Sequence, residues 1–264
     1  MRVANVPICP RSSPSSDTLA AVLSRRGTAA VLAGLLLPAA VVSPAAADDA
    51  VVTTREVVGT SVEGRAIEVV RRAHEGATRR VLVIGSIHGD ERAGMRVVRR
   101  LERRKHLPHD LDLWVARTVN PDGTADDRRT NAHGVDLNRN FPYRWGASPR
   151  GSTWSGPRPM SEPESVALRR LVRRVDPWLV VTFHQPLFGV GANDKGMRTV
   201  RALAAQMRLP VKSYTCTGVC RGTFTGWVNN RTDGLAVTAE FGRTVRDWRI
   251  RRAERAVVRV GSRR

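Results

Sequence analysis

The stretch Val81-Leu82-Val83-Ile84-Gly85-Ser86-Ile87-His88-Gly89-Asp90-Glu91 decides how this chain folds. Its first part is a run of apolar, mostly β-branched residues, which predicts a buried strand over 81–87. The run ends in His88, a glycine and two carboxylates. Because α/β sheets bind ligands at the carboxyl ends of their strands, His88 and Glu91 are candidate metal ligands at that edge.

Strands and helices alternate along the chain around this stretch. Other strands are predicted over 56–60, 65–70, 111–119, 178–183 and 235–238, and helices over 91–105, 161–175, 199–207 and 247–260. Ser161 and Glu164 have the spacing of a capping box at the start of one helix. The polar stretch 120–159 shows no periodicity, and a long stretch of this kind in a compact domain is more often functional than a linker. The alternation predicts an α/β fold.

The N-terminal residues have the pattern of a signal peptide. Arg25-Arg26 precede an uncharged run over 27–47, which closes on an A-x-A site before Asp48. We therefore expect residues 1–47 to be removed and 48–264 to form one catalytic domain. A membrane-spanning helix is the alternative, but Pro38, Pro44 and the short apolar part favour the signal peptide. Export would follow the Sec or the twin-arginine route, and the protein would be secreted or cell-wall associated, without stable membrane insertion.

The charge of the chain is strongly positive. The 44 Lys and Arg and 24 Asp and Glu residues fall to 40 and 23 once 1–47 are removed, which leaves +17 over 217 residues. Nucleic-acid binding is one reading of such charge. The even spread of arginines, the few aromatics, the lack of a nucleic-acid motif and the export signal argue against it. An acidic cell-wall polymer is another binding partner that would suit this positive charge.

Two cysteines, Cys216 and Cys220, remain after Cys9 leaves with the signal peptide. An even pair in an exported chain predicts a disulfide. The alternative is a metal site, but the pair has no histidine nearby.

Two further predicted strands end in polar residues, His184 and Glu240. A lone histidine after a strand is usually structural and a lone glutamate is usually solvated, but four such residues at strand ends are harder to dismiss. Two histidines and one carboxylate form a catalytic zinc set with an open fourth position, in which zinc lowers the pKa of bound water to about 7 and polarises a carbonyl. A second carboxylate must then move the proton, and Glu240 is the candidate.

The polar stretch supplies arginines beside asparagines, in Arg128-Arg129-Thr130-Asn131 and Asn138-Arg139-Asn140. A guanidinium suits a carboxylate, so one arginine could clamp a substrate carboxylate and another could stabilise a tetrahedral oxyanion. For any one arginine in so basic a chain, a solvated surface charge is the alternative.

Seven motifs, taken in order, resemble the zinc carboxypeptidase family of the carboxypeptidase A type, and most closely its bacterial murein peptide amidase branch. They lie at 59–65, 88–91, 120–123, 134–142, 161–164, 183–186 and 238–242. The resemblance implies a three-layer α/β fold with a central mixed, mostly parallel sheet flanked by helices. It also implies that His88, Glu91 and His184 bind one Zn²⁺ and that Glu240 is the general acid/base.

The same resemblance assigns the residues that would bind substrate. Asn138 and Arg139 match the pair that holds a terminal carboxylate, and Arg129 matches the oxyanion arginine, although Arg128 is adjacent and the alignment could slip by one. Asp90 stands where the digestive enzymes carry an arginine, which suggests contact with an amine.

One further residue is given a supporting role, and two tyrosines are not placed. Asp136 is expected to fix a metal ligand or its loop. Neither Tyr143 nor Tyr214 falls convincingly in the loop that carries the family's substrate-covering tyrosine.

The sequence therefore predicts an exported, monomeric zinc metallopeptidase that acts beside a residue with a free C-terminal carboxylate. The favoured substrate is a murein peptide, cleaved between γ-D-glutamate and diaminopimelate. An ordinary carboxypeptidase, a zinc deacylase of the aspartoacylase or succinylglutamate desuccinylase type, and an inactive wall-binding module are the alternatives. The motif at 120–123 and the long polar stretch favour the peptidase over the deacylase, and the intact set of four residues argues against the inactive module.

Overall fold

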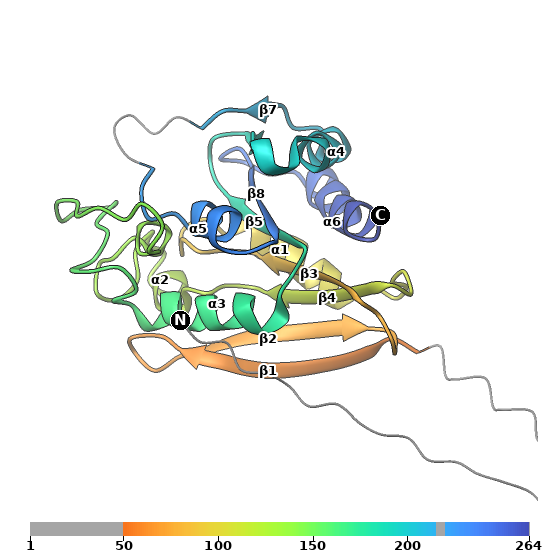
Figure 1. Cartoon of the computed structure of the whole chain (residues 1–264), viewed down its shortest axis with the longest axis horizontal. Coiled ribbons are helices and arrows are strands. Elements are labelled where there is room, and N and C mark those ends of the chain that lie inside the picture. Colours follow the sequence, from red (N-terminus) through yellow and green to blue (C-terminus); the bar gives the residue numbers. More distant parts are fainter. Residues whose placement is uncertain (1–49, 215–219, 264) are drawn as a thin grey trace, which may run out of the picture. The chain divides into compact units, whose positions relative to one another are not determined.

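The computed structural model describes residues 50–214 and 220–263. Within these residues, eight strands form one sheet with helices on both faces (Figure 1). The strands are β1 (Val52–Thr60), β2 (Ala66–Ala73), β3 (Arg79–Ile84), β4 (Leu111–Ala116), β5 (Leu179–His184), β6 (Gly189–Gly191), β7 (Val211–Lys212) and β8 (Leu235–Glu240). The α-helices are α1 (Ala93–Glu102), α2 (Pro121–Ala125), α3 (Pro163–Val175), α4 (Met197–Met207), α5 (Phe224–Arg231) and α6 (Asp247–Gly261), and short 3₁₀ turns lie at Leu137–Arg139 and Asp194–Gly196.

The sheet is mixed, with the strand order β1-β2-β4-β3-β5-β8-β6-β7. Its centre, β4-β3-β5-β8, is parallel, while β1 and β2 join antiparallel on one side and β6 joins β8 antiparallel on the other. Parallel strands bring their carboxyl ends to one edge, so the residues that follow β3, β5 and β8 become neighbours. This confirms the predicted mixed, mostly parallel sheet.

Two apolar cores cover the two faces of the sheet, because successive residues of a strand point to opposite faces. Val81 and Val83 pack with α1, α4 and α6, whereas Leu82 and Ile84 pack with α3 and α5. Figure 1 shows these helices on either side of the central strands. All four strand residues are fully buried, as expected for a parallel strand with both faces covered. The predicted three-layer α/β architecture is therefore present.

Several local predictions differ from the structure. Strand β3 ends at Ile84 and not at residue 87, and helix α1 begins at Ala93 and not at Glu91, so His88 and Glu91 both lie in the turn between them. The predicted capping box is wrong, because helix α3 has Glu162 at its N-cap, with no side-chain cap bond. The carboxylate of Glu164 instead accepts hydrogen bonds from the backbone N–H of Val62 and from Asn131, at 3.1 Å each.

Two predictions concern residues that the structure does not describe. The predicted signal peptide, residues 1–47, lies outside the described residues, and so does Cys216 of the predicted disulfide. Among the helices that are described, none is long and apolar enough to cross a membrane.

Candidate active site

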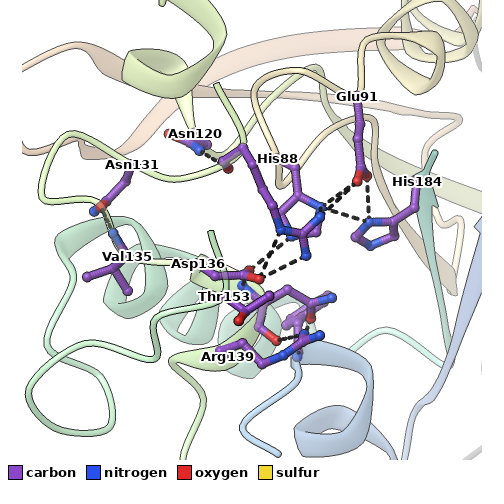
Figure 2. Close-up of polar contacts among 12 residues, drawn as sticks. His88, Glu91, Asn120, Asn131, Val135, Asp136, Arg139, Thr153 and His184 are labelled. Atoms are coloured by element: carbon purple, nitrogen blue, oxygen red, sulfur yellow. Dashed lines mark hydrogen bonds and ion pairs between the residues drawn. The ribbon is translucent and has the colours of Figure 1, made fainter. Parts of the chain in front are cut away.

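His88, Glu91 and His184 converge at the carboxyl edge of the central strands. Their ligand atoms all lie within 4.8 Å of one another, and all three residues are buried. The Nδ1 atoms of both histidines face Glu91, at 2.9 Å for His88 and 2.8 Å for His184, and lie 3.3 Å apart (Figure 2). Two imidazole nitrogens and a carboxylate oxygen around one point are the donor set of a catalytic zinc site, so the residues present fit Zn²⁺.

The charges around this point favour a bound cation. Burial lowers the pKa of His88, but the carboxylates of Asp136 and Glu91 outweigh burial and raise it to about 9. Burial raises the pKa of Glu91, but the two histidines outweigh it and hold this pKa well below its usual range. A site that retains a proton so firmly between carboxylates is one in which a metal cation can take the proton's place.

Asp136 orients the first histidine from behind. It is fully buried, and its Oδ1 lies 3.0 Å from Nε2 of His88, which leaves Nδ1 to face the metal point. The same carboxylate accepts hydrogen bonds from Nε and Nη2 of Arg129, at 3.1 and 2.8 Å, and from the backbone N–H of Asn138 at 2.9 Å. Because carboxylates commonly fix metal-bound histidines in this way, the expected fixing role of Asp136 has a geometric basis.

Glu240 is the last residue of β8 and pairs in register with His184 of β5. Its side chain is only 7% exposed, lines the same cavity as the metal set and accepts a hydrogen bond from the backbone N–H of Leu187 at 3.2 Å. Burial raises the pKa of Glu240, and His184 offsets part of that effect. A carboxyl group with a raised pKa beside a metal site suits proton transfer near neutral pH.

Arg128 and Arg129 differ in their position relative to the central cavity. Arg129 lines the central cavity and donates to Glu91 at 3.2 Å, whereas Arg128 does not line it and pairs with Asp126 at 3.1 Å. Burial lowers the pKa of Arg129, but Asp136 and Glu91 outweigh it and raise the pKa. Of the two candidates, only Arg129 lines the cavity that holds the metal set.

Asn138 and Arg139 line the same cavity. Asn138 Oδ1 accepts from the backbone N–H of Phe224 at 2.9 Å, which ties this turn to helix α5. Burial lowers the pKa of Arg139, and Asp136 partly restores it. Asp90, in contrast, is exposed and does not line the cavity, although its charge contributes to the raised pKa of Arg129.

The cavity measures about 410 Å³ and includes residues that sequence reasoning missed. Tyr214 lines it, and the phenolic oxygen of Tyr214 is buried without a hydrogen-bond partner in the described part of the chain. Burial and the charge of Glu240 raise the pKa of this phenol. Helix α5 adds Thr225 and Asn229 to the wall.

A second buried polar group holds the loops that carry these residues, and we call it the loop-anchoring cluster: Ser61, Asp122, Asn131, Glu162 and Glu164. Asp122 accepts hydrogen bonds from the Ser61 hydroxyl at 2.7 Å, the Arg65 guanidinium at 2.7 Å and the backbone N–H of Glu63 at 3.0 Å. Asn131 donates to Glu162 and Glu164 at 2.7 and 3.1 Å. These bonds join the 61–65 turn, the long polar stretch and helix α3.

A family model and a similar protein of known name point to the same family. The model of the family described as zinc carboxypeptidase matches residues 43–186. Murein peptide amidase A of Escherichia coli is 37% identical over 174 residues, which cover 61% of this chain and 70% of the relative.

Solved structures agree with this relationship. The crystal structure of the murein-tripeptide amidase of Escherichia coli has a TM-score of 0.63 at 29% identity and covers 84% of this chain and 97% of that one. Carboxypeptidase A of Helicoverpa armigera has a TM-score of 0.67 at 18% identity, covering 81% of this chain and 68% of that one, and so shares the fold.

Proposed function

The chain belongs to the zinc carboxypeptidase family, and from that premise we propose that it is an exported peptidase that cleaves murein peptides between γ-linked D-glutamate and diaminopimelate. The family uses one zinc ion, and His88, Glu91 and His184 would hold it here. One observation carries the proposal: a single cavity is lined by this metal set, Glu240, and the pair Asn138 and Arg139. Such a cavity can hold a peptide by its terminal carboxylate beside a hydrolytic centre.

Each residue that lines the cavity has a separate role in the proposed reaction. When bound, zinc lowers the pKa of water to about 7 and polarises a carbonyl group. Arg139 and Asn138 bind the substrate's terminal carboxylate by charge-assisted hydrogen bonds and thereby place the last amide bond at the metal set. Glu240 accepts the proton of the attacking water and returns it to the leaving amine. Arg129 donates to the carbonyl oxygen as negative charge develops there.

The murein substrate is supported by the relatives and by one residue. Two of the similar proteins are named as murein peptide or murein-tripeptide amidases. Asp90 provides a carboxylate at the position where the digestive enzymes carry an arginine, and an amine such as the second amino group of diaminopimelate suits a carboxylate. In the structure Asp90 lies outside the cavity lining, so this contact would form at the cavity's outer edge.

Export is the second part of the proposal. It rests on the basic start, the uncharged run over 27–47 and the A-x-A site before Asp48. Export would place the enzyme beside the cell wall, where its proposed substrate occurs. N-terminal sequencing of the secreted protein tests this, with Asp48 expected as the first residue.

Mass spectrometry of the products tests the proposed reaction. The zinc-loaded protein is incubated with L-alanyl-γ-D-glutamyl-diaminopimelate and, separately, with a series of hippuryl-amino acids. Release of free diaminopimelate from the first is expected. Cleavage of the hippuryl series alone would refute the murein substrate in favour of an ordinary carboxypeptidase. Cleavage of N-acyl amino acids alone would favour a deacylase, and the absence of any turnover with zinc bound would favour the wall-binding module.

A further inference from the structure

A second pocket of about 400 Å³ shares one lining residue, Arg129, with the central cavity. We call it the arginine pocket, defined by Arg128, Arg129, His133, Arg150 and Trp154. The central cavity carries Asn138 and Arg139, which do not line the arginine pocket. Because Arg129 lines both, the arginine pocket lies on the Arg129 side of the central cavity.

The arginine pocket presents positive charge without a lining carboxylate. Three of its residues are arginines, and no aspartate or glutamate lines it, although Arg128 pairs with Asp126 at 3.1 Å and Arg129 with Asp136 at 2.8 Å. The Nε of Arg128 is buried and has no hydrogen-bond partner among residues 50–214 and 220–263. A buried, unpartnered N–H is costly unless a ligand satisfies it, and an anion is the ligand that a guanidinium pairs with best.

Arg150 is positioned by the aromatic wall of the pocket. Its guanidinium carbon lies 4.1 Å from the ring centroid of Trp154, within the range of a cation–π contact, and it has no ion pair with a carboxylate in the described part of the chain. The backbone carbonyl of Trp154 accepts a hydrogen bond from the N–H of Asp136 at 2.8 Å. The pocket wall is thus bonded to the residue that orients His88.

The proposed reaction places a specific anion near this pocket. With the terminal carboxylate at Asn138 and Arg139 and the scissile carbonyl at Arg129, the residue that contributes this carbonyl would extend beyond Arg129, which also lines the arginine pocket. When glutamate is linked through its γ-carboxyl group, its α-carboxylate remains free. We propose that the arginine pocket binds this free α-carboxylate through Arg128 and Arg150, and so selects acyl residues that carry a carboxylate over those that carry a carboxamide.

This inference rests on the proposed function, and one pair of substrates separates the two. The substrates are L-alanyl-γ-D-glutamyl-diaminopimelate with the glutamyl α-carboxylate free and the same peptide with that group as the carboxamide. The zinc-loaded full chain is expected to show a kcat/KM about tenfold higher for the carboxylate, since a charge-assisted pair is lost in the carboxamide. In Arg150→Gln the ratio of kcat/KM for the carboxylate to kcat/KM for the carboxamide is expected to fall towards one, and in Arg128→Gln/Arg150→Gln it should fall further. The kcat/KM for the carboxamide itself should change little.

The matched control is Arg231→Gln, because Arg231 also stacks on an aromatic ring, that of Tyr143 at 5.4 Å, but lines neither pocket. It is expected to retain the wild-type preference. Equal kcat/KM for the two substrates in the wild type would overturn the inference, and so would a double variant that loses activity equally on both. If the wild type cleaves neither substrate, the proposed function itself fails.

Discussion

The structure contains two clusters of buried polar residues that differ in how their polar atoms are paired. We call the first the metal-side cluster: His88, Glu91, Arg129, Asp136 and His184. Its nitrogen and oxygen atoms converge on one another, with both Nδ1 atoms and the Glu91 carboxylate facing a common point. The second is the loop-anchoring cluster, whose carboxylates accept from hydroxyl, amide, guanidinium and backbone donors.

The difference shows how a ligand site can be recognised among buried charges. A buried carboxylate whose oxygens all have donors is complete, and its role is to hold segments together. A group of nitrogen and oxygen atoms whose lone pairs face a common point can bind a cation between them. The two clusters also share the polar stretch 120–140, so a loop fixed by one cluster carries residues of the other.

Glu240→Gln is expected to have the largest effect on the metal side. Removal of a general base commonly costs about 10²–10⁴ in rate, and the amide keeps the shape of the side chain. We expect kcat to fall by this amount while one zinc ion per chain and the thermal midpoint are retained. Kinetics with metal analysis on the same sample checks both, and an unchanged kcat would remove Glu240 from the mechanism.

Arg129→Gln is the next largest change. Loss of one oxyanion donor costs about 10²–10³ in kcat, so a decrease of this size is expected at saturating zinc. Arg128→Gln, measured on a hippuryl-amino acid that carries no acyl-side carboxylate, should stay within about threefold of the wild type. Similar losses in both variants would show that the positions of the two arginines do not distinguish their roles.

Asn131→Ala tests the loop-anchoring cluster. Asn131 is fully buried, and its amide donates to both Glu162 and Glu164, so alanine leaves two buried carboxylates short of a donor. A loss of about 2–3 kcal/mol in the free energy of unfolding is expected. Urea denaturation measures it. Zinc affinity of the folded variant should change much less, and a larger effect on zinc than on stability would mean that the clusters are not separable.

Asp136→Asn tests how far zinc affinity depends on the carboxylate that orients His88. The amide can still accept from Asn138, but it loses the charge that pairs with Arg129 and orients His88. Because loss of an orienting carboxylate commonly costs 10–100-fold in metal affinity, zinc binding should weaken by about this factor. Competition with a chelator measures the dissociation constant. Wild-type affinity would show that the orientation of His88 does not depend on the charge.

The sequence predicted the metal-side cluster better than the loop-anchoring one, for physical reasons. His88 follows an apolar strand, and His184 and its neighbour Glu240 each end one, so strand patterning and the geometry of parallel sheets place them together. Glu164 has an equally clear local pattern, yet its carboxylate bonds to Val62, which is 102 residues away. Local spacing carries no information about such a partner, and a long-range bond displaced the predicted cap.

The elements that sequence analysis missed are short or weakly patterned. Strands β6 and β7 have three and two residues, too few to show alternation. Helix α5 has only eight residues and includes Gly226, so its buried face of Phe224, Trp227 and Val228 shows the helical spacing over a single turn, which is too short to identify a helix. Tyr214 was not placed for a related reason, since its position in the cavity depends on the packing of these same segments.

The smallest expected effect contrasts two carboxylates of the loop-anchoring cluster through pH. Burial raises the pKa of Asp122, but hydrogen bonds from Ser61, Arg65 and the backbone of Glu63 outweigh burial and lower it. Asp122 therefore stabilises the fold above its unfolded pKa of about 3.9, and this contribution is lost as the pH falls. For Glu164, burial dominates and raises the pKa, so its contribution is present below about pH 4.3 and is lost as the pH rises through the raised value.

The stability deficit of Asp122→Asn, relative to the wild type at the same pH, should consequently shrink as the pH is lowered from about 5 to about 3, through the unfolded pKa of Asp122. The deficit of Glu164→Gln should instead grow as the pH is lowered from about 7 to about 4, because the wild type gains from protonating Glu164 and the glutamine does not. Urea denaturation at matched pH values gives both differences. Because each variant is compared with the wild type at the same pH, the loss of zinc in acid affects both proteins and cancels. Differences that run parallel with pH would mean that the two carboxylates respond alike, and that hydrogen bonding does not set Asp122 apart from Glu164.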